Sequence, residues 1–257
     1  MKTNSIFTAL LIGTGLVATA CIADPGVADD VGEEYGIEEG RVGEAEEALQ
    51  IAWPVAAWHF DVNCSGATAF DSSGNDLHGV RSGGVNCAAG AKGGKSLEFN
   101  GTNGKVEIPD QAALDFTTAM TVSACVKPQS LASGTILSKW YALDSYQLGV
   151  SSGNVLFSVA FPGGQWGVTK DVTAPAATGV WQHVAGVYDG ANLLLYRNGA
   201  LVASTPASGT LQQSSRPVVI GNHPSWSAFN GNIDHVYLYN RALTAAEIGT
   251  LKAECLN

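Results

Sequence analysis

The sequence predicts an all-β fold, an antiparallel two-sheet sandwich with one short C-terminal helix. Asp189-Gly190 and Asn198-Gly199 lie between short apolar runs and predict hairpin turns, because such dipeptides tolerate positive φ. The two turns lie about ten residues apart, a spacing typical of antiparallel sandwiches. Charged residues make up only 14% of the chain, and glycine accounts for 31 of 257 residues, which suits a domain of many strands and turns.

The expected strands are short apolar or alternating runs bounded by turn residues such as Gly and Pro. They cover residues 52–62, 96–100, 105–108, 120–126, 135–140, 146–150, 155–161, 166–173, 181–188, 193–197, 201–204, 217–221 and 232–239. The one expected helix begins at Thr244, because Glu247 three residues later completes a capping-box pattern. Residues 64–87 are rich in Gly, Ser, Asn and Asp and are expected to be loop with brief extended pieces.

The first 50 residues are expected to precede the domain, which covers residues 51–257. Residues 1–20 combine Lys2, an apolar run and small residues, which predicts a secretory signal peptide. Residues 21–50 are acidic and nearly free of aromatic residues, so they cannot bury enough apolar surface to fold and are expected to be a disordered tether. The formal net charge of −10 is concentrated there, which argues against nucleic acid as a partner.

The five cysteines form an odd set that becomes even when Cys21 is set aside. Cys21 follows small residues in a pattern similar to a bacterial lipobox, which favours a lipid anchor over plain secretion. The remaining four suit disulfide bonds in an oxidising compartment. We expect Cys64 and Cys87 to form a bridge that closes the loop-rich segment between them and stabilises it by roughly 3 kcal/mol.

A co-linear series of segments resembles the laminin-G-like domains of the concanavalin-A-like lectin and glucanase superfamily. The segments are WHFD (58–61), DSSGNDLHG (71–79), GKSLEFNG (94–101), MTVSACVKP (120–128), TILSKW (135–140), WQHVAGVYDG (181–190), LYRNGALVAS (195–204), VVIGN (218–222) and FNGNIDHVYLYNRALTAAEI (229–248). The resemblance implies a jelly-roll sandwich and, commonly, a carbohydrate-binding or protein-adhesion module.

The resemblance also implies a second disulfide bond. The family usually has Trp where this chain has Cys125, and this departure suggests a bridge to Cys255, just past the last helix. Two unpaired, buried thiols are the alternative. The Trp-x-His pattern at Trp181 and His183 resembles a fold marker of the family, with Trp181 expected in the core.

Calcium is the cofactor that the resemblance suggests. Related sandwiches often hold a structural Ca²⁺, and the matching positions here are Asp61, Gly101 and Asp234, whose oxygens are of the kind Ca²⁺ prefers. Asp71 and Asn75 offer a second oxygen-rich loop. The alternative for that loop is that both side chains bond the backbone of their own turn.

The resemblance implies two kinds of enzyme site: polysaccharide lyases of this fold use Arg, Gln or His, and Tyr, and retaining glucanases of this fold carry paired carboxylates on one strand, where alternation places both on one face. Residues 51–257 contain no such pattern, and Glu98 and Glu107 fall on different expected strands. His183 and Tyr188 lie five residues apart on one strand, so they are expected on opposite faces. The sequence contains no CxxC or HExxH zinc spacing. We therefore expect no catalytic site, and a glycan-active enzyme is the least favoured alternative.

Four aromatic residues at strand ends or in loops are the candidate ligand contacts: Trp140, Tyr141, Trp166 and Trp226. A flat aromatic ring stacks on a sugar face while polar groups at its rim bond hydroxyls. The connections 140–145 and 162–165 flank two antiparallel strands joined at 151–154, so both emerge at the same end of the sheet. The first three aromatic residues are therefore expected to form one patch, although covering a sheet edge is the alternative. The sequence predicts a secreted or outer-surface lectin-like module that binds a glycan, with a structural or protein-adhesion module as the alternative. Its only expected contact with a membrane is the lipid anchor.

Overall fold

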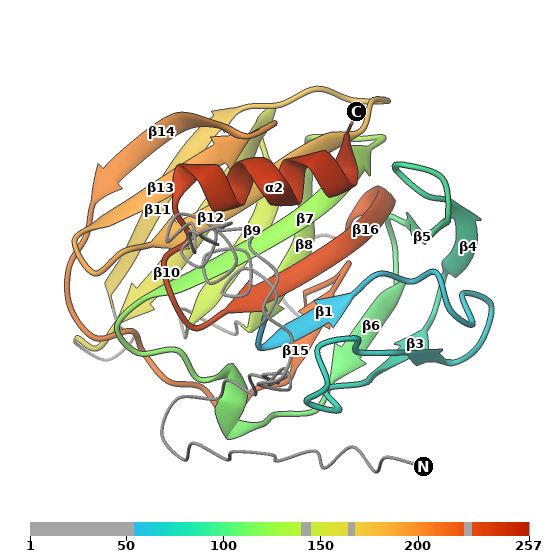
Figure 1. Cartoon of the computed structure of the whole chain (residues 1–257), viewed down its shortest axis with the longest axis horizontal. Coiled ribbons are helices and arrows are strands. Elements are labelled where there is room, and N and C mark those ends of the chain that lie inside the picture. Colours follow the sequence, from blue (N-terminus) through green and yellow to red (C-terminus); the bar gives the residue numbers. More distant parts are fainter. Residues whose placement is uncertain (1–53, 140–144, 164–167, 224–227, 257) are drawn as a thin grey trace, which may run out of the picture. The chain divides into compact units, whose positions relative to one another are not determined.

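The computed structural model of the chain describes residues 54–139, 145–163, 168–223 and 228–256 (Figure 1). The predicted signal peptide 1–20 and tether 21–50 lie outside these residues, as does Cys21. The four candidate aromatic residues, Trp140, Tyr141, Trp166 and Trp226, also lie outside the described residues.

The described residues form two eight-stranded antiparallel sheets, which confirms the predicted jelly-roll sandwich. The first sheet has the order β14-β13-β12-β7-β16-β5-β4, and β1 also pairs with β16. Its strands are β1 Ala56–Trp58, β4 Val85–Ala89, β5 Lys95–Asn100, β7 Met120–Pro128, β12 Gln182–Tyr188, β13 Asn192–Arg197, β14 Ala200–Pro206 and β16 Asn230–Tyr239.

The second sheet has the order β11-β10-β9-β8-β15-β6-β3-β2. Its strands are β2 Thr68–Ala69, β3 Gly79–Ser82, β6 Lys105–Ile108, β8 Ser133–Lys139, β9 Tyr146–Ser151, β10 Asn154–Phe161, β11 Val168–Pro175 and β15 Val218–Ile220. The strands β8 to β11 follow one another as an antiparallel meander. One extra residue in β8, Ile136, shifts its register against β9.

The core lies between the two sheets and is built from alternate side chains of each strand. Its largest members include Trp58, Phe99, Phe157 and Tyr188, and burying a side chain of this size stabilises the fold by about 1.5–3 kcal/mol. The expectation that Trp181 packs in this core is wrong, because Trp181 precedes β12 and is only half-buried. Trp58 fills the core instead and donates its indole N–H to the carbonyl of Leu77.

The two predicted hairpin turns differ in their chemistry. Asn198 and Gly199 both have positive φ, 51° and 82°, as expected for a tight Asn-Gly turn. In the other turn only Gly190 has positive φ, at 90°. Asp189 caps that turn instead, because its Oδ1 accepts hydrogen bonds from the backbone N–H groups of Ala191 and Asn192.

The predicted C-terminal helix is α2, Ala245–Cys255, and it lies across the outer face of the first sheet (Figure 1). Thr244 and Glu247 form the expected capping box: the Thr244 hydroxyl accepts from the N–H of Glu247, and Glu247 accepts from the N–H of Thr244. Ile248 and Leu251 of α2 are buried in a second apolar cluster on the outer face of the first sheet. A single-turn 3₁₀ helix, η1 Ala112–Leu114, was not expected. Among the described residues, no helix has the length and apolar character needed to cross a membrane.

Both predicted disulfide bonds are confirmed. Cys64 and Cys87 are bridged, with their Cα atoms 5.4 Å apart, and the bond holds the long β1–β4 connection to the sheet. Cys125 of β7 is bridged to Cys255 at the end of α2, with a Cα separation of 5.6 Å. The second bond therefore ties the C-terminal helix to a central strand of the first sheet.

Candidate functional site

The outer face of the second sheet carries a line of polar side chains across its four meander strands. On β9 and β10, residues such as Leu148 and Phe157 point into the core, so their neighbours along the strand point outward. Asp171, Ser158, Gln147 and Ser138 are outward residues that lie directly opposite one another on β11, β10, β9 and β8. We call these four residues the polar row.

Exposure falls along the polar row. Asp171 is exposed at the β11 edge, Ser158 is 5% exposed, and Gln147 and Ser138 are each 1% exposed. On the far side of Ser138 the row ends at Val219 of β15, an apolar residue that is 6% exposed. The polar row therefore leads from solvent at one edge of the sheet to an enclosed position over its centre.

Several buried polar atoms on this side of the sheet have no hydrogen-bond partner. They are Gln147 Nε2 and Ser138 Oγ in the polar row, Thr135 Oγ1 on β8, and Ser145 Oγ directly before β9. Leaving a buried polar group unbonded costs about 1–3 kcal/mol. Such groups are rare in native proteins and commonly serve a ligand, water or chemistry. Because these four hydroxyl and amide groups lie on or beside adjacent strands of one sheet, we take this face as the candidate site.

The candidate aromatic patch is bracketed by described residues at one end of the second sheet. Lys139 at the end of β8 pairs with Tyr146 at the start of β9, and Phe161 pairs with Val168 across β10 and β11. The strand ends that precede Trp140, Tyr141 and Trp166 therefore share one end of the sheet, as the chain order predicted. The positions of the aromatic side chains themselves stay a prediction.

Of the proposed calcium set, Asp61 and Asp234 lie at one connection and Gly101 lies away from them, and the binding of calcium stays a prediction. Asp61 Oδ1 accepts from the N–H of Lys95 at 2.7 Å, and Asp234 Oδ2 accepts from the N–H of Ala91 at 3.0 Å, both at the β4–β5 connection. Gly101 lies beyond the opposite end of β5, beside Asn230. Asn230 is four residues before Asp234 on β16, so about 13 Å of strand separates Gly101 from the two carboxylates.

Asp71 bonds the backbone of its own loop, as the alternative for that segment had it, whereas the Asn75 side chain bonds Val55, outside the loop. The Asp71 carboxylate accepts from the N–H groups of Ala57, Ser73 and Leu77 and from the Ser73 hydroxyl. Burial opposes ionisation of Asp71, but these hydrogen bonds outweigh it and lower its pKa. Asn75 donates to the carbonyl of Val55. The loop is a turn-capping structure, and Asp71 has its acceptor positions occupied by protein donors.

The two strand-borne glutamates cannot act as a catalytic pair. Glu98 points outward from β5 in the first sheet, because its neighbours Leu97 and Phe99 are in the core. Glu107 points outward from β6 in the second sheet and bonds Lys105. Among the described residues, these carboxylates therefore lie on opposite outer faces of the sandwich, whereas a retaining glycosidase needs them about 5 Å apart.

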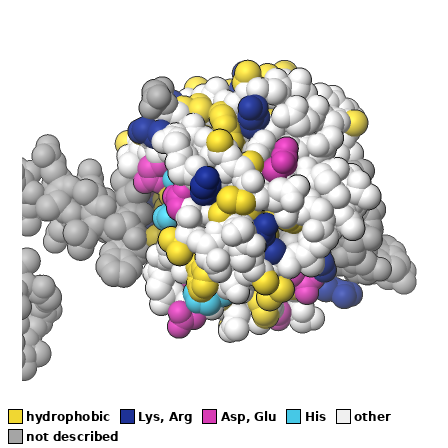
Figure 2. All heavy atoms as spheres, turned by 90° about the vertical axis from the view of Figure 1, so that its right-hand side faces the viewer, with side chains coloured by type: hydrophobic (Ala, Val, Ile, Leu, Met, Phe, Trp, Pro, Cys, Tyr) yellow, Lys and Arg dark blue, Asp and Glu magenta, His cyan; other side chains and the backbone are white. Residues whose placement is uncertain are grey.

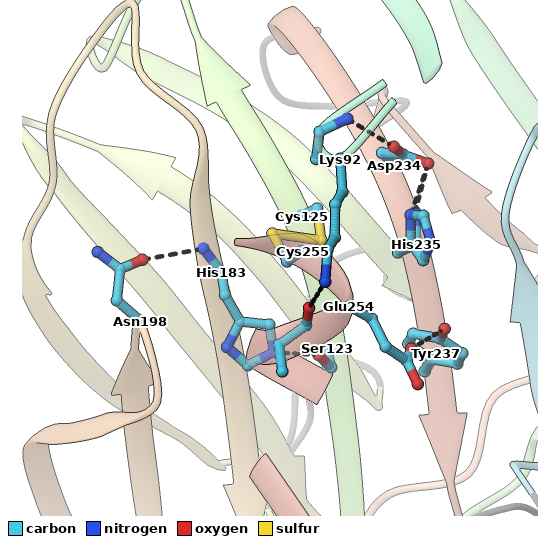
Figure 3. The surroundings of a disulfide bond; sticks show 12 residues. Lys92, Ser123, Cys125, His183, Asn198, Asp234, His235, Tyr237, Glu254 and Cys255 are labelled. Carbon is cyan, nitrogen blue, oxygen red and sulfur yellow. Dashed lines mark hydrogen bonds and ion pairs between the residues drawn. A yellow bond between two sulfur atoms is a disulfide. The ribbon is translucent and has the colours of Figure 1, made fainter. Parts of the chain in front are cut away.

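A serine–histidine pair that sequence reasoning missed lies beneath α2 (Figure 3). Ser123 Oγ is 2.8 Å from His183 Nε2, and the side chains come from the paired strands β7 and β12. Both residues are 1% exposed, and His183 Nδ1 has no hydrogen-bond partner, so a carboxylate that would orient the ring is missing among the described residues. The pair is a buried structural contact under the helix.

His183 is expected to make the fold sensitive to acid. Burial, assisted by the charge of Lys252, lowers the pKa of His183 to about 4, below the ordinary value of 6.5. The unfolded chain therefore takes up this proton first as the pH falls. Neutral His183 contributes at most about 3 kcal/mol to the free energy of unfolding. This contribution is fully present above pH 6.5 and is lost as the pH falls toward 4. Urea unfolding at pH 7 and pH 4 measures this effect. The free energy of unfolding should fall less between the two pH values in His183→Asn than in the wild type, and an equal fall would contradict the assignment.

A second polar cluster includes His59, directly after β1, and residues of β16 and α2, of which Asp234, His235, Tyr237 and Glu254 are labelled in Figure 3. The rings of His59 and His235 are 5.2 Å apart, Asp234 Oδ1 lies 3.0 Å from His235 Nδ1, and Tyr237 donates to Glu254. Burial and the neighbouring His235 lower the pKa of His59. The pKa of His235 is raised, because the attraction of Asp234 outweighs the effect of burial. Among the described residues, no three His, Cys, Asp or Glu side chains form a group suited to a metal ion.

An ion cluster lies inside the sandwich at the end of β8, next to the strand ends that flank the candidate patch. Lys139 is completely buried, and its ammonium donates to Asp110, to Asp115 Oδ1 at 2.8 Å and to the Ser214 carbonyl at 2.7 Å. The side chains of Asp110 and Asp115 are 36% and 29% exposed. The three ammonium protons thus each have an acceptor, as a buried charge requires.

The edge of the sandwich that carries β3, β4 and β5 is shown in Figure 2. Charged side chains of both signs are interspersed there with hydrophobic ones, and neither kind gathers into one large patch. A single-sign patch would favour a charged polymer as partner. This edge therefore shows no patch suited to a charged polymer.

Comparison with known proteins supports the fold. The family model described as "Concanavalin A-like lectin/glucanases superfamily" matches residues 100–249. None of the curated proteins compared matches the chain.

Several solved structures are similar in fold. The binding domain of Paraclostridial Mosquitocidal Protein 1 has a TM-score of 0.64 and 15% identity over 79% of this chain and 52% of its own. Domain 4 of AbnA, an extracellular arabinanase from Geobacillus stearothermophilus, was solved in complex with arabinotriose. It has a TM-score of 0.61 and 22% identity, and the match covers 78% of this chain and 98% of that domain. The binding domain of Botulinum neurotoxin DC, in complex with rat synaptotagmin II, has a TM-score of 0.64 and 14% identity. The match covers 80% of this chain and 52% of that domain. The chain thus spans about half of each toxin domain, and at these identities the likeness concerns the fold.

Proposed function

Because the chain belongs to the concanavalin A-like lectin and glucanase superfamily, we propose that it is a non-catalytic module that binds a glycan on the outer face of the second sheet. The observation that carries the proposal is the polar row with its buried, unbonded Gln147 and Ser138 side chains. Amide and hydroxyl groups are the partners that sugar hydroxyls use, and a hydrogen bond made away from water is the stronger one. The arabinotriose complex of a similar domain supports the choice of ligand class.

A non-enzymatic role is favoured by the placement of the acidic residues. Glu98 and Glu107 lie on opposite faces, and the Ser123–His183 pair is enclosed beneath α2. In the polar row only Asp171 can ionise, and one carboxylate cannot act as both acid and nucleophile. The site is therefore suited to holding a ligand.

Gln147→Leu is expected to weaken glycan binding by about tenfold or more without lowering stability. Losing good hydrogen bonds to a ligand costs about 1–3 kcal/mol, whereas replacing an unbonded buried amide with an apolar group is nearly neutral for folding. A glycan array first identifies the glycans that bind. Affinity for those glycans is then measured for the wild type and the variant, in calcium-containing buffer and in chelator, together with the melting temperature of each protein. Binding should persist in chelator, because the row offers neutral donors and acceptors.

Gln182→Leu is the matched control. Gln182 is also a buried glutamine on a strand, but its amide donates to the Ala177 carbonyl at 2.7 Å and accepts from the Ala177 N–H at 3.2 Å. This variant should lower the melting temperature and leave glycan binding unchanged. No signal with any glycan would reject the proposal and favour a protein-adhesion module, as in the synaptotagmin complex of a similar toxin domain.

We place the module outside the cell. The signal-like residues 1–20 and the two disulfide bonds support this location. A lipid on Cys21 would anchor it to an outer surface by the acidic residues 21–50. Mass spectrometry of the mature N-terminus tests this part: a diacylglycerol-modified Cys21 supports the anchor, and an unmodified N-terminus supports plain secretion.

A further inference from the structure

Lys139 differs from the other lysines in the described part of the chain, because it alone is completely buried. Its side chain is 0% exposed and lies on the inner face of β8, beside Tyr146, its buried partner on β9. Leu114 and Phe116 are buried next to this pair, and the rings of Phe116 and Tyr146 are 5.3 Å apart. The ammonium therefore lies at the wall of the apolar core, where water cannot solvate it.

Two carboxylates are in hydrogen-bond contact with the Lys139 nitrogen. Its Nζ donates to Asp110 Oδ1, to Asp115 Oδ1 at 2.8 Å and to the Ser214 carbonyl at 2.7 Å. Burial raises the pKa of Tyr146, and the charges of Asp115 and Asp110 raise it further, so both carboxylates lie near that buried ring. An amine is thus held against two carboxyl groups beside an apolar wall.

An amine held against a carboxyl group in such a place can condense with it to form an amide. The attacking group is the neutral amine, and apolar surroundings favour neutral groups over charged ones, as in the reactive lysines of enzymes. Well-oriented intramolecular reactions also reach effective concentrations of about 10⁵–10⁸ M. This advantage opposes hydrolysis by water, so the fold favours the condensed form.

We propose that Lys139 and Asp110 join in an intramolecular isopeptide bond, with Asp115 carrying the proton. The Lys139 ammonium gives one proton to the Asp115 carboxylate, and the resulting amine attacks Cγ of Asp110. A C–N bond forms and one C–O bond of Asp110 breaks. The departing oxygen takes the proton from Asp115 and a second proton from the attacking nitrogen, and it leaves as water. The third ammonium proton stays on the amide nitrogen, Asp115 is again a carboxylate, and no oxidant or cofactor is required.

The surroundings of the two aspartates favour these roles. The Asp110 side chain is 36% exposed, so the water that it releases has a way to solvent, whereas Asp115 is 29% exposed. The Ser214 carbonyl remains as the acceptor for the single N–H of the amide. The bond joins two positions 29 residues apart, at the ends of β6 and β8, and it is independent of both disulfide bonds.

Peptide mapping of the full chain tests the bond. The folded protein is reduced, alkylated and digested, and its peptides are sequenced by tandem mass spectrometry. We expect a branched peptide that joins Lys139 to Asp110 and is lighter than its two linear parts together by one water molecule. Trypsin should not cleave after Lys139, because it does not accept an acylated lysine. Only linear peptides at both positions would overturn the proposal, and a bond to Asp115 would overturn the assigned roles.

Lys105 and Glu107 provide an internal control in the same digest. Lys105 Nζ lies 2.5 Å from Glu107 Oε2, but the two side chains are 38% and 45% exposed. Water solvates both charges there, so the peptide that holds this pair should show no loss of water. A loss at this pair would show that closeness alone gives the product, and it would overturn the role of the buried site.

Asp115→Asn tests the proton carrier and keeps both atoms that the new bond joins. The rate at which the linked peptide accumulates after cell-free synthesis under oxidising conditions should fall about 10²-fold or more, the usual contribution of general acid–base catalysis. Asp115→Glu keeps a carboxylate and should restore part of the rate. An unchanged rate in Asp115→Asn would overturn the role of Asp115. The wild-type digest decides the bond itself even where this variant does not fold.

The bond is independent of the proposed function, because it lies at the wall of the core and involves no ligand. A variant without Lys139 and a variant without both aspartates lose it alike. A comparison of their stabilities therefore still measures the effect of the buried charge.

Discussion

Replacing Cys125 and Cys255 with alanine lowers the free energy of unfolding by about 5 kcal/mol in the chain-entropy relation, because the bond closes a loop of 130 residues. Alanine is the appropriate replacement, since both cysteines are buried and a serine hydroxyl would lack a partner. Denaturant unfolding under non-reducing conditions measures this change. We expect α2 to loosen first, because its last residue is then no longer linked to β7.

The other disulfide bond provides the matched control. Cys64 and Cys87 are separated by 23 residues, so replacing both with alanine should cost about 3 kcal/mol. The longer loop should thus give the larger loss. An equal or smaller loss for the Cys125–Cys255 pair would show that strain or residual structure in the unfolded chain, and not loop length, sets the contribution of this bond.

The second large effect is expected at Lys139. Changing both Asp110 and Asp115 to asparagine should cost about 3–5 kcal/mol, because it leaves a fully buried ammonium with only neutral acceptors, among them the Ser214 carbonyl. Lys139→Met should cost less. The two carboxylates are partly exposed and can be hydrated, and the Met side chain fills much of the same space. Urea unfolding of both variants measures the difference.

A triple variant completes the test of this cluster. Combining Lys139→Met with both asparagine changes removes the buried charge together with its partners, so stability should recover part of the loss of the double variant. If Lys139→Met is the more damaging change, the carboxylates and not the ammonium are the groups that depend on the pairing.

Much of the fold could be predicted because several signals are local. The Asn198-Gly199 turn, the Thr244–Glu247 capping box and the alternation in residues 105–108 each depend on neighbours in the chain. The cysteine pairs were also predictable, from the even number left after Cys21 and from the departure at Cys125. The burial of the Trp181 side chain could not be predicted, because an aromatic residue just before a strand can face the core or its rim.

The candidate site could not be predicted, because it depends on register between strands. The strands β9 and β10 are buried on both faces, so their sequences lack the alternation that would mark Gln147 and Ser158 as outward residues. The extra residue Ile136 in β8 then decides that Ser138 lies opposite Gln147. Lys139 has the same difficulty, since a lysine at a strand end is ordinarily read as exposed.

The position of β16 in the first sheet has a consequence for how the chain folds. This strand, Asn230–Tyr239, lies between β7 and β5 and is the strand with which β1 pairs, so β1 and the β4–β5 pair are joined to the rest of the first sheet only when nearly the whole chain is present. The meander β8 to β11 closes through short connections and can form early. A ribosome-bound chain that ends before Asn230 should therefore protect the meander from hydrogen exchange while β1 remains unprotected, and completion of the first sheet should be the slow, late step.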